Sequence, residues 1–237
     1  SDAVQRDATQ TDGLSNLLIS TDPPYYDNID YSDLSDYFYV WLRRSLRRIY
    51  PDTFATMLTP KDDELIVLPL RHEGGAVQAK SFFEDGMRAT FKRLSLAISD
   101  SYPLTVYYAY KQSESTDDGR TSSGWETMLQ ALMDADLQIT GTWPMRTERE
   151  GRTIGLGSNA LASSIVLVCR KRSNNAPVAT RPEFQRELRR TLRRGLEDLQ
   201  QGSIAPVDMA QASIGPGMAA FSKYSKVVES DGTPMSV

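Results

Sequence analysis

The sequence predicts an α/β fold in which a mostly parallel sheet carries helices on both faces. The main observation is that short apolar runs alternate along the chain with longer stripes of apolar residues at helical spacing. The runs are rich in β-branched and aromatic residues, which suits buried strands. A length of 237 residues with 40% hydrophobic and 24% charged side chains is ordinary for one large domain with or without appendages.

The first predicted elements are a strand and a helix. Residues 17–20 form a short apolar run that ends in the stretch STDPPYYDN, residues 20–28. A helix is expected next, opened by Ser32 or Asp33, closed by Pro51, and buried along one face. Its apolar stripe comprises Leu34, Phe38, Trp41, Leu42, Ser45 and Ile49. The neighbouring aromatic set is expected mainly in the core, with the alternative that one tyrosine borders a site: Tyr37, Phe38, Tyr39 and Trp41.

The middle of the chain continues the alternation. Residues 64–75, ELIVLPLRHEGG, could hold a strand, and a helical stripe follows at Phe83, Met87, Phe91, Leu94 and Ile98. LTVYYAY at 104–110 suits a buried strand, and a polar loop follows it. A capping box of Ser123 and Glu126 opens a third helix that carries Trp125, Met128, Leu129 and Leu132. QITGTWPM and SSIVLVCR are the last two strands of the predicted sheet.

The chain is predicted to divide into residues 1–175, 176–202 and 203–237. The first part is the α/β domain, and the second is an amphipathic helix that ends at Gly202. Thr180, Pro182 and Glu183 supply its cap, its first-turn proline and its capping-box acid. Its stripe is Phe184, Leu188, Leu192, Leu196 and Leu199. Residues 203–237 show scattered Gly, Pro, Ser and Met with little periodicity, which predicts an extended or partly mobile tail.

Composition excludes several kinds of site. Cys169 is the only cysteine and lies in an apolar run, so a buried structural thiol is expected rather than a nucleophile, and disulfides are excluded. His72 is the only histidine, so neither a Ser-His-Asp triad nor a zinc site of nitrogen and sulfur ligands is expected, and no metal is predicted. Neither a membrane span nor a signal peptide is recognised, which predicts a cytoplasmic protein.

The basic residues are clustered although the net charge is -4. RRSLRR occupies 43–48 and RELRRTLRR occupies 186–194. The second run forms the polar face of the C-terminal amphipathic helix, where solvation is favoured over contact with DNA.

The stretch at 20–28 lies where a strand ends, which is the edge of an open α/β sheet at which ligands bind. Each proline fixes its own backbone and restricts the residue before it, so Asp22-Pro23-Pro24 makes a rigid loop with outward carbonyls. A carboxylate, a free carbonyl and the flat ring of Tyr25 together suit a planar group that bears an exocyclic amine, such as a nucleobase. The alternative is a turn that merely ends the strand.

Asp22-Pro23-Pro24-Tyr25 resembles the DPPY catalytic tetrapeptide of amino-group DNA methyltransferases. The longer context DPPYYDNIDYSDLSDYFYVWLRRSL, with GWETMLQALMDADLQITGTWPMRTE and NALASSIVLVCR, resembles more narrowly the large adenine-specific DNA methylases that carry a domain of unknown function. The resemblance covers nearly the whole chain. It implies the later strands of a Rossmann-like methyltransferase sheet, mostly parallel with an antiparallel last strand, and it makes residues 1–175 the half that receives the target base.

The resemblance also implies a chemistry. S-adenosylmethionine would donate a methyl group to N6 of an adenine flipped out of DNA. The Asp22 carboxylate and the Pro23 carbonyl would accept the amino hydrogens, Pro24 would stiffen the loop, and Tyr25 would stack on the base. RNA or N4 of cytosine is a second candidate substrate, and a DNA-binding or assembly fragment without turnover is a third interpretation.

Other candidate residues are less specific. Tyr26 and Asn28 could line the base pocket, and Asp22 with Tyr26 could contact the cofactor, although Asp27 and Asn28 equally suit a helix cap. The loop from 146 to 162 is expected at the same sheet edge, where Arg146, Arg149, Arg152 and Asn159 could contact DNA, or form an ordinary solvated hairpin. GLGSN at 155–159 precedes a strand and is not expected to bind a nucleotide.

The last expectation concerns the cofactor-binding signature of such enzymes. A glycine-rich loop after a first strand, with an acidic residue after the second, is not found in the sequence. An upstream part of the same enzyme is therefore the expected partner, and the chain alone is expected to bind S-adenosylmethionine weakly and to methylate poorly. An incomplete sheet exposes an edge and an apolar face, so the chain is expected to form a homodimer, to swap elements, or to cover the gap with its own tail.

Overall fold

The computed structural model describes residues 6–10, 13–27, 29–108, 123–146, 163–201 and 206–235. Its main sheet has four strands in the order β1-β2-β4-β3. These are β1 (Ile19–Thr21), β2 (Leu104–Tyr108), β3 (Leu137–Arg146) and β4 (Ser163–Lys171). β1 runs parallel to β2, whereas β4 runs antiparallel to both of its neighbours. The fold is therefore α/β with a mixed sheet, and the last strand of this sheet is antiparallel.

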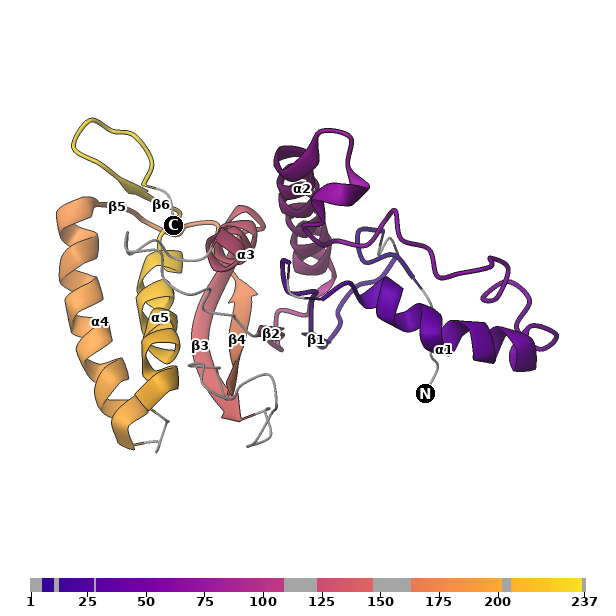
Figure 1. Ribbon diagram of the computed structural model, residues 1–237. Helices are drawn as coiled ribbons and strands as arrows, with labels where there is room; N and C mark the ends of the chain where they lie inside the picture. The colour runs from indigo at the N-terminus through magenta and orange to yellow at the C-terminus, as the bar shows by residue number, and fades with distance from the viewer. Residues whose placement is uncertain are drawn as a thin grey trace.

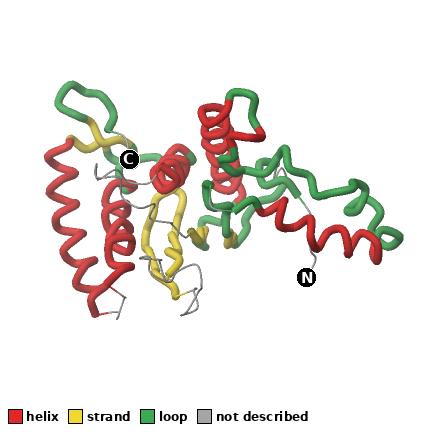
Figure 2. Tube along the Cα trace, viewed as in Figure 1, coloured by secondary structure: helices red, strands yellow, loops and turns green. Residues whose placement is uncertain are grey.

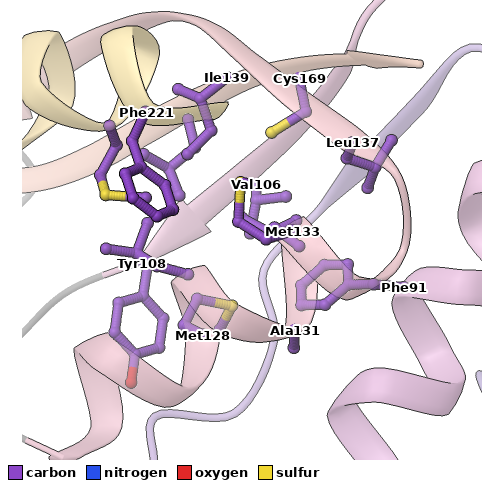
Figure 3. Packing of buried hydrophobic residues seen from close by; sticks show 14 of the residues in the cluster. Phe91, Val106, Tyr108, Met128, Ala131, Met133, Leu137, Ile139, Cys169 and Phe221 are labelled. Carbon is purple, nitrogen blue, oxygen red and sulfur yellow. The ribbon is translucent and has the colours of Figure 1, made fainter. Parts of the chain in front are cut away.

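One face of the sheet carries the core. Leu104, Val106 and Tyr108 of β2 stand opposite Cys169, Leu167 and Ile165 of β4, and all six are buried. The helices α2 (Gly75–Ala97), α3 (Ser123–Asp134) and α5 (Pro206–Ser222) contribute to the same cluster. Figure 3 shows side chains from all three helices meeting the strands, among them Phe91, Met128 and Phe221.

The opposite face of the sheet is only partly buried. On this face Tyr107 and Val168 are half-buried and Trp143 is 67% exposed, whereas Val166 and Ser164 of β4 are buried. Buried and half-buried residues alternate along β2, a pattern that belongs to a sheet covered on one side. The helices of the core cluster lie on the other face, so among the described residues a helical layer on both faces stays a prediction.

Two predicted helices occupy the places that their stripes indicated. Phe83, Met87 and Phe91 are buried along α2, and Ile98 caps its C-terminus. Trp125, Met128, Leu129 and Leu132 are buried along α3. The stretch 64–75 differs, because it forms a loop and the short 3-10 helix η1 (Pro69–Arg71) instead of a strand. Pro69 lacks a backbone N–H and opens that helical turn, which accounts for the difference.

The C-terminal part contains α4 (Arg181–Gln201), α5, and a two-stranded parallel sheet of β5 (Val178–Thr180) and β6 (Lys226–Val228). The predicted capping box is confirmed, because the Thr180 N–H and hydroxyl both donate to Glu183 Oε2 at 2.8 Å. Figures 1 and 2 show α4 and α5 side by side at one end of the molecule.

The prediction of an extended tail over 203–237 was wrong. α5 takes up 17 residues of this segment and packs on β3, where the buried Ser222 hydroxyl accepts a hydrogen bond from the Ile139 N–H at 2.9 Å. The glycines and Pro216, which argued against a helix, instead permit close contacts. A Cβ at Gly215 would overlap the side chain of Thr142, and a Cβ at Gly195 of α4 would overlap the Pro216 ring.

The helix α1 (Tyr31–Leu46) forms where it was predicted but presents the other face. The apolar stripe expected in the core is exposed, including Leu34, Phe38 and Trp41, whereas Ser32 and Tyr39 are buried. The polar side of the helix is held by the loop that follows it: the Thr59 hydroxyl and Lys61 donate to the Asp36 carboxylate at 2.6 and 2.7 Å. Figure 1 shows α1 projecting away from the sheet beyond β1.

Candidate functional site

The loop Asp22–Tyr25 leaves the carboxyl end of β1 and lies at a shared edge of the sheet. Because β2 is parallel to β1, its last residue, Tyr108, reaches the same edge. Because β4 is antiparallel, its first residues reach that edge as well, with Ile165 opposite Tyr108. The carboxyl end of β3 pairs with the start of β4, so all four strands have an end at this edge. The edge at which ligands bind in open α/β sheets is therefore the one that carries this loop.

Asp22 and Tyr25 are joined directly. The Tyr25 hydroxyl donates a hydrogen bond to Asp22 Oδ1 at 2.8 Å, which bridges the two ends of the Pro-Pro turn. The tyrosine ring is half-buried and the carboxylate is exposed. Burial of the ring, then the hydrogen bond to Asp22, raises the pKa of Tyr25 well above its ordinary value. The phenol therefore stays protonated and serves as a donor that orients the carboxylate.

Aromatic rings form a row behind Tyr25. Its ring meets the Tyr108 ring edge to face at 5.4 Å between centroids, and Tyr108 stacks on Trp125 of α3 at 5.4 Å. Gly124 leaves room for this row, because a Cβ there would lie 2.9 Å from the Tyr26 Cβ and 3.1 Å from the Tyr108 hydroxyl. The row anchors one side of the Tyr25 ring to the core and fixes the position of the loop.

Two residues at this edge were not singled out from the sequence. Tyr31, at the start of α1, has a raised pKa because its ring is partly buried and because the Asp22 carboxylate is near. Ser164, buried at the start of β4, hydrogen-bonds to Tyr25, which slightly offsets the rise in the pKa of Tyr25. No local pattern marks either residue. Only the placement of α1 and β4 against the loop brings them to the site.

Tyr26 points away from the edge. Its ring packs edge to face against Phe83 of α2 at 5.2 Å, and its carbonyl accepts a hydrogen bond from the Val67 N–H at 2.8 Å. Its φ of 34° lies in the left-handed region, which turns the chain sharply after Tyr25. The side chain is thus used for packing, and the geometry gives it no contact with a ligand at the edge.

The other candidate residues are placed only in part. Arg146 ends β3 at the candidate edge, and its side chain lies outside the described residues. Asn28, Arg149, Arg152 and Asn159 lie outside them entirely. Asp27 is described and exposed.

A charged network lies beside the site, where the loop from 59 to 71 meets α1. Arg71 donates to Glu64 and to Asp33, each at 2.7 Å, and Glu64 in turn accepts from the Ser32 N–H at 3.0 Å. Bonds from Ser32 and Arg71 lower the pKa of Glu64 although burial opposes them. A shallow pocket of about 300 Å³ opens beside this network and is lined in part by His72 and Phe82. The charged groups of the network are bonded to one another within the protein, so we interpret the network as structural.

The chemistry available at the edge is that of oxygen acceptors and aromatic rings. The Asp22 carboxylate keeps one oxygen beside the Tyr25 hydroxyl, and the Pro23 carbonyl has no backbone partner among the described residues. Cys169 is buried, and burial raises the pKa of its thiol to about 12. Within the described part of the chain, no group of three His, Cys, Asp or Glu side chains could hold a metal ion, and no helix is both long and apolar enough to cross a membrane.

Comparison with known proteins finds no protein-family model, no curated protein and no solved structure that matches the chain.

Proposed function

We propose that this chain carries the catalytic loop of an amino-group methyltransferase that acts on N6 of adenine in DNA. The observation that supports the proposal is the Asp22–Tyr25 hydrogen bond at 2.8 Å, made at the carboxyl edge of a parallel strand pair. A turn that merely ended a strand would need neither an oriented carboxylate nor an aromatic row behind it. The strand arrangement, with its antiparallel last strand, is compatible with the Rossmann-like methyltransferase sheet that the resemblance implies.

Methyl transfer to an exocyclic amine needs two acceptors at the amino group. The nitrogen lone pair is delocalised into the ring, and acceptors that hold both amino hydrogens favour a nitrogen with an available lone pair. In the proposal the free oxygen of Asp22 and the Pro23 carbonyl take these hydrogens. The Tyr25 hydroxyl keeps the carboxylate turned toward the base, and the exposed side of the Tyr25 ring contacts it. Catalysis then consists of positioning, without a covalent intermediate.

S-adenosylmethionine is the proposed methyl donor. Asp22 is proposed to approach its methyl-bearing end, whereas Tyr26 contributes the backbone turn rather than its ring. Most cofactor contacts are proposed to come from the upstream part of the enzyme that the resemblance implies. Calorimetric titration with S-adenosylmethionine, with and without that part in trans, tests this division: tight binding by the chain alone would contradict it.

RNA or N4 of cytosine stays the second candidate substrate, because a Pro-Pro-aromatic loop serves any exocyclic amine. An aspartate before the prolines favours adenine by resemblance. Transfer of tritium from labelled S-adenosylmethionine to matched DNA and RNA oligonucleotides, followed by nucleoside analysis, separates the three products.

Variants of the loop test the catalytic proposal itself. With enzyme in excess over DNA, slow formation of N6-methyladenine is expected from the wild-type chain. Asp22→Ala should abolish it, and Tyr25→Phe should lower the rate while leaving the ring in place. Asp27→Ala is the matched control, because this exposed carboxylate lies in the same loop. All four chains should unfold at similar denaturant concentrations.

The outcomes distinguish the candidate functions. Equal methylation by the Asp22→Ala and wild-type chains would overturn the role of the loop. No methylated base of any kind under enzyme-excess conditions, together with DNA binding that survives Tyr25→Ala, would favour the assembly fragment.

A further inference from the structure

The exposed face of α1 is an apolar surface that the proposed function does not use. Its aromatic residues are mostly in solvent: Tyr37 is 71% exposed, Phe38 is 65% exposed and Trp41 is 61% exposed. The spacing of Tyr37 and Phe38 from Trp41, four and three positions, places them on one side of the helix, with the exposed Leu34 on the same side. A continuous apolar stripe of this kind marks an interaction surface.

The helix cannot turn this stripe inward. Its opposite side is fixed by Asp36, which accepts bonds from Thr59 and Lys61, and by the buried Tyr39, whose hydroxyl donates to the Thr56 carbonyl at 3.1 Å. The Tyr39 ring also packs on Phe54 at 5.4 Å between centroids. Rotating α1 would break these contacts, so the stripe stays outward until something covers it.

Charge is distributed unevenly along α1. Around the N-terminal end, six carboxylates face two cations: Asp30, Asp33, Asp36, Asp62, Asp63 and Glu64 against Lys61 and Arg71. The C-terminal end carries Arg43, Arg44, Arg47 and Arg48, and none of these makes an ion pair within the described residues. Two arginines of α4 differ, because Arg190 and Arg193 pair with Glu187 and Glu197.

We propose that α1 is the contact surface of a homodimer, in which the α1 helices of two copies pack antiparallel across their apolar stripes. Centring the pair near Tyr39 sets Asp30 of one copy opposite Arg48 of the other, and Asp33 opposite Arg44. Asp33 and Arg44 lie about three turns apart on one flank of the helix, and Asp30 and Arg48 lie just beyond its two ends. Equivalent flanks meet in an antiparallel pair. The same register sets Tyr37 against Trp41, and it opposes the two helix dipoles.

The area that the stripe offers is adequate for such a contact. If a ring side chain can bury about 150–250 Å², the exposed parts of Tyr37, Phe38 and Trp41 amount to about 400 Å² per copy. The exposed aliphatic residues of the stripe enlarge this toward the roughly 800 Å² per partner that specific interfaces bury. Self-complementary charge at both ends then fixes the register, as a two-fold contact requires.

A second copy of the chain would cover more of the α1 surface than a nucleic acid would. Phosphates would pair with the arginine end, but they would leave Leu34 and Phe38 uncovered and would be repelled by the acidic end. Another copy covers the stripe and satisfies both ends at once. The inference does not depend on the proposed methyltransferase activity.

The test is the mass of the chain in solution, measured by light scattering and sedimentation from low to high micromolar concentration. The wild-type chain is expected at twice its 26.5 kDa. Phe38→Glu should raise the dissociation constant by about 30-fold or more, which is the effect of removing a central interface anchor. Val77→Glu is the matched control, because Val77 is 82% exposed on a different helix, and it should leave the dimer intact.

Exchanging charges tests the antiparallel register. Arg48→Glu alone and Asp30→Arg alone should each weaken self-association, and the two variants mixed should form a heterodimer that is tighter than either homodimer. A wild-type chain that stays monomeric, a dimer that tolerates Phe38→Glu, or a monomer that binds duplex DNA through Arg44 and Arg48 would overturn the proposal.

Discussion

The close approach of α5 to the sheet leads to a prediction in which one substitution has opposite effects at two sites on the same helix. Gly215 lies against Thr142 of β3. A Cβ added at Gly215 would overlap the Oγ1, Cγ2 and Cβ atoms of Thr142. Rotating the Thr142 side chain cannot relieve this overlap, because its Cβ is fixed by the backbone of β3. Gly217 differs, since a Cβ there would meet only Leu188 Cδ1 at 3.6 Å, an ordinary van der Waals distance.

The expected magnitudes follow from helix propensity and overpacking. Alanine in place of glycine favours a helix by about 1 kcal/mol, so Gly217→Ala should raise the free energy of unfolding by up to that amount. At Gly215 the overlap costs about 1–3 kcal/mol, and Pro216 disfavours a helical residue with a Cβ before it, so Gly215→Ala should lower the free energy of unfolding by about 1–2 kcal/mol.

Urea unfolding followed by circular dichroism measures both variants under identical conditions. A double-mutant cycle with Thr142→Gly isolates the contact, because removing that side chain should abolish most of the penalty at Gly215 and leave Gly217→Ala unaffected. If Gly215→Ala and Gly217→Ala stabilise the chain equally, α5 does not dock on β3 as described.

Three further predictions concern single polar groups. Ser222→Ala should lower the free energy of unfolding by about 1–3 kcal/mol, because the Ile139 N–H would lose its buried partner; urea unfolding measures this, and no loss would contradict the contact. The bond to Lys61 lowers the pKa of Asp36 to about 2 from 3.8. The stability that Asp36 contributes is therefore present above pH 3.8 and is lost as the pH falls toward 2. Asp36→Asn should remove this step when the free energy of unfolding is measured against pH. Cys169 should react with a thiol reagent at pH 8 only after denaturant is added, since it is buried and its pKa is about 12, and rapid reaction without denaturant would refute its place in the core.

Much of the core could be predicted from the sequence because its signals are local and repeated. The stripes of α2 and α3 bury the side chains that their spacing selected, and the β-branched and aromatic runs at β2 and β4 form buried strands. The capping box at Thr180 and Glu183 formed because both partners lie within one turn of each other. Each of these elements is determined by residues a few positions apart, which is the range over which sequence patterns are reliable.

The tail could not be predicted in this way, because its glycines serve contacts with segments far away in the chain. Gly215 and Pro216 lower the helix propensity of the sequence around them, which favoured an irregular segment. In the fold the same residues let α4, α5 and β3 approach closely, and Ser222 supplies a partner for a strand N–H 83 positions away. Tertiary packing thus outweighs a local preference that is worth only about 1 kcal/mol per residue.

The candidate site was predictable only in part. Asp22, Pro23 and Tyr25 stand out because two prolines and an aromatic ring after a strand are rare, and the structure joins the first and last of them by a hydrogen bond. Tyr31 and Ser164 reach the same edge from α1 and β4, and no spacing within either segment indicates it. A site assembled from the ends of separate elements becomes visible only when strand order and direction are known.

The helix α1 shows why an amphipathic pattern does not by itself say which face is covered. Hydrophobic burial favours the apolar stripe inward by about 25 cal/mol for each Å² removed from water, yet the chain places its polar side against its own loop. That side offers Asp36 two partners and Tyr39 a buried position, and these contacts use groups within the same segment of the chain. The apolar side then has no intramolecular partner among the described residues. A stripe that hydrophobicity would bury, left exposed by a helix that is fixed in place, is most simply explained as a surface that is buried when another molecule binds.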